Sequence, residues 1–187
     1  MGNKPSWYDE LGYDFIVKCL SKLDDSPIVS IGSGTCGHEI NLEKLINRKI
    51  ICVDPEGKFS SDGPIKEERK PDFATAKDYL AANPDGSCHM LIIWPDPNFS
   101  TYDVEAIQLL KPKTITIVYE STGGSGGATL STWLESIGGP KAGWDDNNAA
   151  KNLYPEIKYK IVDMLEKPFK TKSVLDSYNH AVVHLSQ

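Results

Sequence analysis

The chain has 187 residues, of which 40% are apolar and 25% are charged. This length and apolar content suffice for one domain with a full hydrophobic core, so a disulfide-dependent miniprotein and a disordered chain are both excluded. The formal net charge of −6 argues against a protein that coats nucleic acid through bulk electrostatics.

The four cysteines are scattered without a C-x-x-C pair and no secretory leader opens the chain, so we expect a reducing, cytoplasmic setting. The longest strongly apolar run, Met90 to Trp94, is too short for a transmembrane segment. The first six residues fit the pattern for N-myristoylation at Gly2 and also a helix cap by Ser6, and we favour the cap. A single acyl chain on Gly2 would give only a weak membrane anchor.

Apolar periodicity switches regularly between helix-like and strand-like segments. Thr75 and Asp78 match a capping box, and Phe73-Ala74 suggests a minimal strand before it. The segment 56–71 is too rich in glycine and proline for more than one short helix. The pattern predicts helices at 6–23, 38–47 (with Leu42, Leu45 and Ile46 inward), 76–82, 100–110 (capped by Ser100) and 128–137, and strands at 28–31, 50–53, 88–94, 114–119, 158–165 and 178–185.

These elements predict one α/β domain over residues 1–187, with a Rossmann-like core at 28–139 between an N-terminal helix (1–25) and C-terminal strands (157–187). The strand from Cys88 to Trp94 is apolar on both faces, as is typical of the middle of a parallel sheet. The last two strands have no helix between them and should pair antiparallel. We therefore expect a mostly parallel, seven-stranded sheet with helices on both faces.

The strongest local motif is the glycine-rich stretch Gly32-Ser33-Gly34-Thr35-Cys36-Gly37, between a predicted strand and a predicted helix. The glycines permit a tight turn and close approach of a ligand, and the helix amides offer positive partial charge. At the end of the next strand, Asp54 can accept hydrogen bonds from two vicinal ribose hydroxyls. The order of strand, glycines, helix, strand and acid predicts a nucleoside-type ligand.

A second motif, Asp96-Pro97-Asn98-Phe99, follows the central strand, where ligands bind in open α/β sheets. An amine that attacks a methyl group needs its lone pair aimed along the line of attack. Asp96 can orient such an amine, and Phe99 can stack on a planar substrate. A rigid proline turn, with Asp96 capping the loop, accounts for the same residues.

The order of these features resembles the class I S-adenosylmethionine-dependent methyltransferases. Asp96 to Phe99 is similar to the [DNS]-P-P-[YFW] motif of amino-group methyltransferases, with Asn98 in place of the second proline. Trp94-Pro95-Asp96-Pro97 also looks like the F-P-D-P-W segment of tRNA 7-methylguanosine methyltransferases, but the basic residues that follow it there are missing here.

The resemblance implies direct in-line methyl transfer to a nitrogen acceptor, with S-adenosylmethionine as the small-molecule cofactor. The sequence departs from the family in its G-x-G-x-x-G spacing, which is that of dinucleotide-binding proteins, and in Ser30, where the family carries an acid that helps to anchor the methionine part of the cofactor. The implied cofactor-binding residues are Gly32, Ser33, Gly34, Gly37, Asp54, Thr75 and Trp94, and the implied catalytic residues are Asp96, Pro97, Asn98 and Phe99.

Two other functions stay open. Ser30, Asn98 and the short crossover at 56–71 suit a non-catalytic binding or structural protein that keeps this fold. The G-x-G-x-x-G spacing of the glycines, which matches the dinucleotide-binding motif, suits an NAD-dependent oxidoreductase. His180 and His184 would stand about 13 Å apart on a strand, so no metal site is predicted. The methyl acceptor is not identified, and no bulk nucleic-acid binding is expected.

Overall fold

A computed structural model describes residues 12–55, 57, 67–95, 101–120, 127–142, 149–170 and 177–187, with the backbone alone described for 167–170 and 177–180. The helices are α2 (Tyr13–Leu20), α3 (Gly37–Ile46), α4 (Ala76–Ala82), α5 (Tyr102–Leu110) and α6 (Ala128–Ser136), with a short 3-10 helix, η2 (Lys151–Leu153). The strands are β1 (Ile28–Ile31), β2 (Ile50–Val53), β3 (His89–Ile93), β4 (Thr114–Glu120), β5 (Lys160–Lys170) and β6 (Ser177–Ser186).

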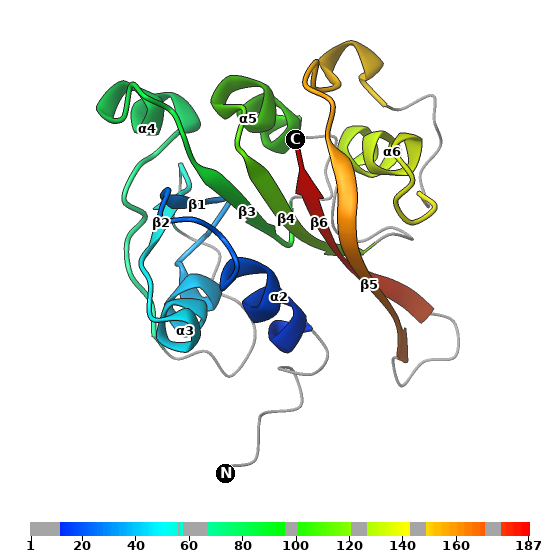
Figure 1. The fold of residues 1–187 in the computed structure, drawn as a ribbon, viewed down its shortest axis with the longest axis horizontal. Helices are drawn as coiled ribbons and strands as arrows, with labels where there is room; N and C mark the ends of the chain where they lie inside the picture. Colours follow the sequence, from blue (N-terminus) through cyan, green and yellow to red (C-terminus); the bar gives the residue numbers. More distant parts are fainter. Residues whose placement is uncertain are drawn as a thin grey trace.

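The described strands form one mixed sheet in the order β2-β1-β3-β4-β6-β5. The first four are parallel, and β6 runs antiparallel to both β4 and β5. Helices α2 and α3 cover one face and α4, α5 and α6 the other, which gives three layers (Figure 1). The predicted α/β architecture, with helices on both faces and a closing antiparallel pair, is confirmed.

The prediction of seven strands was wrong, because the described residues form six. The minimal strand expected at Phe73-Ala74 is reduced to a single parallel bridge between Val53 and Phe73. Among the described residues, the sheet therefore ends at β2, with this single bridge beside it.

Side chains take the place of a seventh strand along the free edge of β2. The guanidinium of Arg69 donates to the carbonyl of Ile50 (2.7 Å), and the carboxylate of Asp72 accepts from the amide of Cys52 (2.9 Å). These backbone groups of β2 are already satisfied, so no strand ladder is needed to pair them. The local contacts of 67–73 thus explain why a longer strand does not form.

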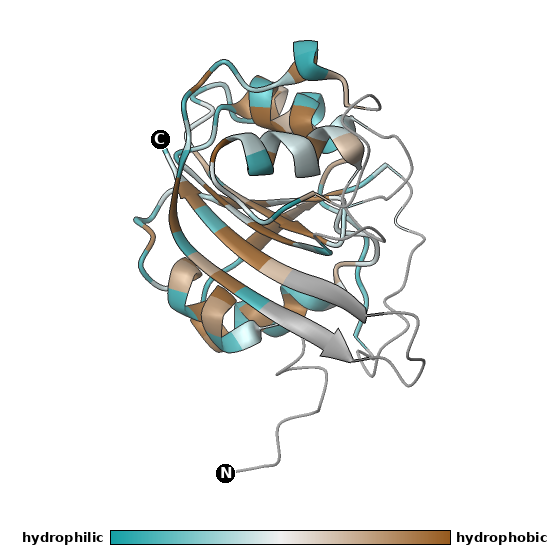
Figure 2. Cartoon of the chain, turned by 90° about the vertical axis from the view of Figure 1, so that its right-hand side faces the viewer, coloured by the Kyte–Doolittle hydropathy of each residue, from teal (hydrophilic) through white to brown (hydrophobic). Residues whose placement is uncertain are grey.

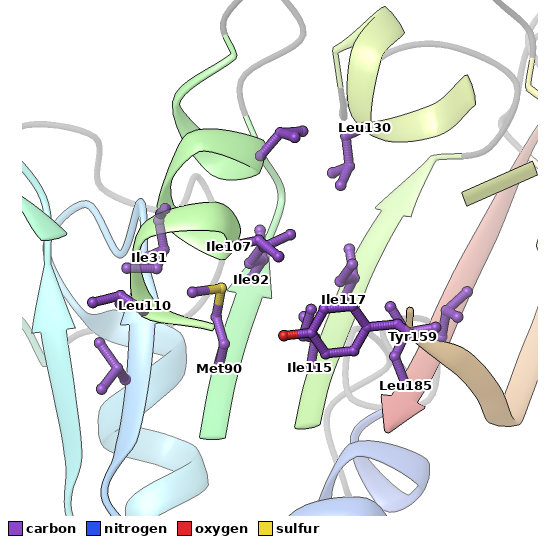
Figure 3. Packing of buried hydrophobic residues seen from close by; sticks show 14 of the residues in the cluster. Ile31, Met90, Ile92, Ile107, Leu110, Ile115, Ile117, Leu130, Tyr159 and Leu185 are labelled. Carbon is purple, nitrogen blue, oxygen red and sulfur yellow. The ribbon is translucent and has the colours of Figure 1, made fainter. Parts of the chain in front are cut away.

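Two apolar clusters fill the spaces between the layers, because successive strand residues point to opposite faces. Figure 2, at right angles to Figure 1, shows the strands between helices above and below. Helix α2 presents Tyr13, Ile16 and Leu20 to the sheet, where they meet Leu91 and Val118. On the opposite face (Figure 3), the cluster includes Ile31, Met90, Ile92, Ile107, Leu110, Ile115, Ile117, Leu130, Tyr159 and Leu185.

Details of three predicted helices differ from the structure or lie outside the described residues. Gly12, at φ 67°, precedes α2, which begins at Tyr13, while the start expected at Ser6 lies outside the described residues. Leu45, predicted to face inward, is 46% exposed, because α3 buries Leu42 instead. Ser100 also lies outside the described residues, and the N-cap of α5 is Thr101. No helix in the described part of the chain is long and apolar enough to cross a membrane.

Candidate functional site

The carboxyl ends of three neighbouring strands meet at one edge of the sheet. Ile31, the last residue of β1, pairs with Val53 of β2 and with Ile92 of β3. Because these strands are parallel and level, the residues that follow them emerge side by side. The structure thus brings together the glycine-rich turn, Asp54 and Trp94.

The glycine-rich turn rests on the end of β2. Gly32 and Gly34 have φ values of 71° and 53°, in the left-handed region that glycine adopts without strain. The amide of Gly32 donates to the carbonyl of Val53 (2.8 Å), and Gly37 is the first residue of α3. Ser33 Oγ lies 3.7 Å from Cys36 Sγ, within the turn.

Asp54 faces the turn and holds two backbone amides. Its Oδ2 accepts from the amide of Gly34 (3.0 Å), and its Oδ1 accepts from the amide of Gly57 (2.7 Å). The side chain is half-buried. A carboxylate oxygen can accept more than one hydrogen bond. The carboxylate is therefore a fixed acceptor at the strand edge.

Tyr102, from the first turn of α5, lies against Gly32. A Cβ on Gly32 would stand 2.2 Å from the Tyr102 hydroxyl oxygen. Any other residue at position 32 would therefore clash with this side chain. In this structure the bare face of the glycine accommodates a protein side chain, and Tyr102 belongs to the site although no sequence motif indicated it.

A groove of about 530 Å³ runs between the starts of α4 and α5. Tyr102 lines the groove and also lies against Gly32. The carbonyl of Phe73 accepts from the amide of Asp54 (3.1 Å), and Thr75, two residues further along the chain, lines the groove as well. The groove therefore begins beside the glycine-rich turn and Asp54, which together form the predicted nucleoside site. Its lining residues are Thr75, Ala76, Lys77, Tyr102, Glu105, Ala106, Gln108 and Leu109.

Thr75 caps α4, as predicted. Its Oγ1 accepts from the amide of Asp78 (3.2 Å), and the carboxylate of Asp78 accepts from the amide of Thr75 (3.0 Å). The Thr75 hydroxyl also donates to the Asp78 carboxylate (2.7 Å). Because the hydroxyl is committed to this capping box, the contribution of Thr75 to a ligand site is mainly steric.

Trp94 directly follows β3 and lies in the left-handed region, at φ 55°. Its amide donates to the carbonyl of Val118 (3.0 Å), and its side chain packs against the apolar cluster under α2 and α3. This places Trp94 at the same strand edge as Gly32. The four predicted catalytic residues, Asp96, Pro97, Asn98 and Phe99, lie outside the described residues.

A buried carboxyl group stands beside Ser30, the position at which the sequence lacks an acid. The Ser30 hydroxyl donates to Glu39 Oε1 (2.6 Å), while Glu39 Oε2 has no hydrogen-bond partner among the described residues. Glu39 is 1% exposed, and this burial raises its pKa to about 7. Sequence reasoning missed Glu39, because only the packing of α3 on β1 brings it to Ser30.

Solved structures share this fold. The chain superposes on a proposed RNA methyltransferase from Pyrococcus horikoshii with a TM-score of 0.52 and 9% identity, over 92% of this chain and 78% of that one. The TM-score is 0.44 for the tRNA (uracil-54, C5)-methyltransferase of Pyrococcus abyssi in complex with S-adenosyl-L-homocysteine (13% identity, 91% of this chain and 37% of that one). It is 0.45 for the magnesium protoporphyrin IX methyltransferase of Synechocystis PCC 6803 with bound S-adenosylhomocysteine (12% identity, 100% and 90%).

No protein-family model matches the sequence, and neither does any curated protein. The superposition on the Pyrococcus horikoshii protein shows that the chain has the class I methyltransferase fold. At 9% identity this likeness concerns the fold alone, so the activity has to be argued from the site.

Proposed function

We propose that this chain is an S-adenosylmethionine-dependent methyltransferase that binds the adenosine part of its cofactor at the carboxyl edge of β2, β1 and β3. The placement of Asp54 is the observation that carries the proposal. Its carboxylate is fixed against Gly34 at 3.0 Å and stays half-exposed, at the edge where ligands bind in open α/β sheets.

The donor and acceptor groups at this edge suit an adenosine. The two oxygens of Asp54 match the two vicinal hydroxyls of a ribose, since each oxygen accepts an amide bond and a carboxylate oxygen can accept more than one hydrogen bond. The adjacent groove of about 530 Å³ lies within the range of about 300–1,000 Å³ that is usual for small-molecule sites. We therefore assign the base to the groove, between Thr75 and Tyr102.

The remaining predicted cofactor residues lie along the same edge of the sheet. Ser33 and Gly37 frame the turn, and Trp94 closes the strand edge next to it. Because the Tyr102 hydroxyl fills the face of Gly32, a ligand approaching the turn would meet Tyr102 as well as the backbone. Tyr102 joins the proposed site for this reason.

The proposed chemistry needs no covalent intermediate on the protein. When bound, S-adenosylmethionine supplies a methyl group on a sulfonium leaving group. We infer a nitrogen acceptor and direct in-line transfer from the motif Asp96 to Phe99, which follows β3 in the chain. In this proposal Asp96 orients the acceptor amine and Phe99 stacks on it, so that the protein contributes alignment.

A non-catalytic protein with the same fold is the second candidate. The filled face of Gly32 and the serine at position 30 both favour it, since each departs from an open cofactor turn. An NAD-dependent oxidoreductase is less well supported, because among the described strands β4 is followed by the antiparallel pair β5 and β6 and not by a second parallel half.

Calorimetric titration with S-adenosylhomocysteine tests the cofactor assignment. We expect the wild-type chain to bind and Asp54→Ala to bind about 10- to 100-fold more weakly, which corresponds to hydrogen bonds with a charged group worth about 1.5–3 kcal/mol. Asp85→Asn, at an exposed acid after α4, is the matched control and should bind as the wild type does. Circular dichroism verifies that each variant is folded.

The catalytic step is tested separately with a radiolabelled methyl donor and a panel of amines. Asp96→Ala should keep cofactor binding and abolish transfer. Absence of heat with the wild-type chain would overturn the cofactor assignment. Binding without transfer to any amine would favour the non-catalytic candidate.

A further inference from the structure

The side chain of Tyr102 covers the glycine at which the glycine-rich turn begins. Tyr102 is the first residue of α5 and is half-buried. A Cβ atom placed on Gly32 would have its three nearest neighbours in this one side chain, with the hydroxyl oxygen at 2.2 Å, Cζ at 3.3 Å and Cε1 at 3.5 Å. A glycine usually lets a ligand approach the backbone closely, and here a hydroxyl of the protein takes that space.

The groups proposed to hold a nucleoside lie beside this contact. The carboxylate of Asp54 is assigned to the ribose and the groove between α4 and α5 to the base. The base and the 5′ carbon leave a ribose on opposite sides of its ring oxygen, so a base in the groove directs the 5′ carbon along the turn. Asp54 is bonded to this turn through the amide of Gly34 (3.0 Å). A large 5′ substituent therefore needs the space over Gly32, whereas adenosine itself does not.

We propose that Tyr102 is a selectivity residue of this site, whose hydroxyl over Gly32 admits adenosine and opposes nucleosides with a large 5′ substituent, such as the amino-acid part of S-adenosylmethionine. The inference rests on the proposed cofactor site. For the larger ligand to bind, the side chain of Tyr102 has to rotate away from Gly32. The groove of about 530 Å³, which Tyr102 also lines, provides room beside it.

The selectivity arises from the populations of two positions of Tyr102. A ligand that binds only the protein with Tyr102 rotated away has its apparent affinity reduced by the fraction of molecules in that position. Minor conformers of proteins are commonly populated at about 10% or less, so the hydroxyl weakens binding of the larger ligand about 10-fold. Adenosine binds with Tyr102 in either position and escapes this reduction.

Calorimetric titration with two ligands, adenosine and S-adenosylhomocysteine, tests the role of the hydroxyl. Tyr102→Phe removes the atom that lies over Gly32 and keeps the ring. We expect this variant to bind S-adenosylhomocysteine about 10-fold more tightly than the wild type and adenosine with unchanged affinity. Tyr154→Phe is the matched control, because Tyr154 is also half-buried and follows η2, and it should bind both ligands as the wild type does.

The outcomes separate the role of Tyr102 from the cofactor assignment. If Tyr102→Phe gains no affinity for S-adenosylhomocysteine, or gains equally for both ligands, the selectivity role is wrong while the cofactor site stands. If Tyr102→Phe binds both ligands more weakly, the hydroxyl holds the nucleoside and does not oppose it. If none of the three proteins binds either ligand, the proposed cofactor site is wrong and the inference falls with it.

A double-mutant cycle tests the contact itself without any ligand. Gly32→Ala adds a methyl group that meets the Tyr102 hydroxyl, and it also strains the backbone at φ 71°. The backbone strain is the same with or without the hydroxyl, so it cancels when the two backgrounds are compared. We expect Gly32→Ala to lower the urea midpoint more in the wild type than in Tyr102→Phe. Equal decreases in both backgrounds would show that the hydroxyl does not cover Gly32 and would overturn the inference.

Discussion

At the scale of single residues, Glu39 makes the free energy of unfolding depend on pH. Its folded pKa of about 7 lies above its ordinary value of 4.5, because burial outweighs the hydrogen bond from Ser30 and the charge of Arg69. The folded chain therefore holds this proton more tightly than the unfolded chain does. The resulting contribution to stability is fully present below pH 4.5 and is lost as the pH rises to about 7. Glu39→Gln removes the charge, so the variant should gain about 3 kcal/mol relative to the wild type between pH 4.5 and 8.

Urea unfolding of both proteins across this pH range provides the measurement. Glu156→Gln, which neutralises an exposed carboxylate, is the control and should follow the wild-type curve. If the difference between Glu39→Gln and the wild type stays constant from pH 4.5 to 8, Glu39 is not a buried acid with a raised pKa.

Single residues also show what the sequence could and could not predict about the site. Asp54 and the glycine-rich turn could be proposed as neighbours because strand, turn, helix and acid follow one another along the chain. Tyr102 was missed because its contact with Gly32 joins residues 70 positions apart (102 − 32) and depends on how α5 packs beside β1. Contacts of this kind follow from packing and leave no local pattern.

At the scale of elements, α4 depends on its capping box. The helix spans only Ala76–Ala82, and its first turn is held by the reciprocal bonds between Thr75 and Asp78. Thr75→Ala should lower the free energy of unfolding by about 1 kcal/mol, as is typical for loss of an N-cap. Denaturant unfolding measures the loss.

Two further variants make this test specific. Thr75→Ser keeps the capping oxygen and should restore most of the stability, whereas Lys77→Ala changes an exposed neighbour on the same helix and should have little effect. A Thr75→Ser variant as unstable as Thr75→Ala would mean that the methyl group, and not the cap, stabilises α4.

Elements whose signals are local were predicted closely. The bounds of β1, β2 and α4 agree with prediction, because turn residues or a cap mark each end. The minimal strand predicted at Phe73-Ala74 is reduced to one bridge, because the side chains of Arg69 and Asp72 form hydrogen bonds with the backbone at the edge of β2. Such side-chain pairing of a strand edge cannot be seen in the apolar alternation of the sequence.

At the scale of the whole molecule, buried and half-buried histidines should make the fold sensitive to acid. His38, His89 and His184 all have lowered pKa values, with burial as the largest cause, and that of His38 falls to about 4. A lowered histidine pKa means that the unfolded chain binds protons that the folded chain does not, in the window below pH 6.5. Stability should therefore fall as the pH drops from 6.5 towards 4.

Glu39 opposes this trend in the same window, because it holds a proton in the folded chain that it loses on unfolding between pH 4.5 and 7. Near pH 5.5 the proton that His38 takes up on unfolding is offset by the one that Glu39 releases, so the lowered pKa values of His89 and His184 decide the sign and leave a net uptake, worth about 1.4 kcal/mol per pH unit for each net proton. Urea unfolding at pH 5, 5.5 and 6 measures this slope, which should steepen in Glu39→Gln because the opposing group is gone. A wild-type stability that rises on acidification would show that the histidines are not held neutral by burial.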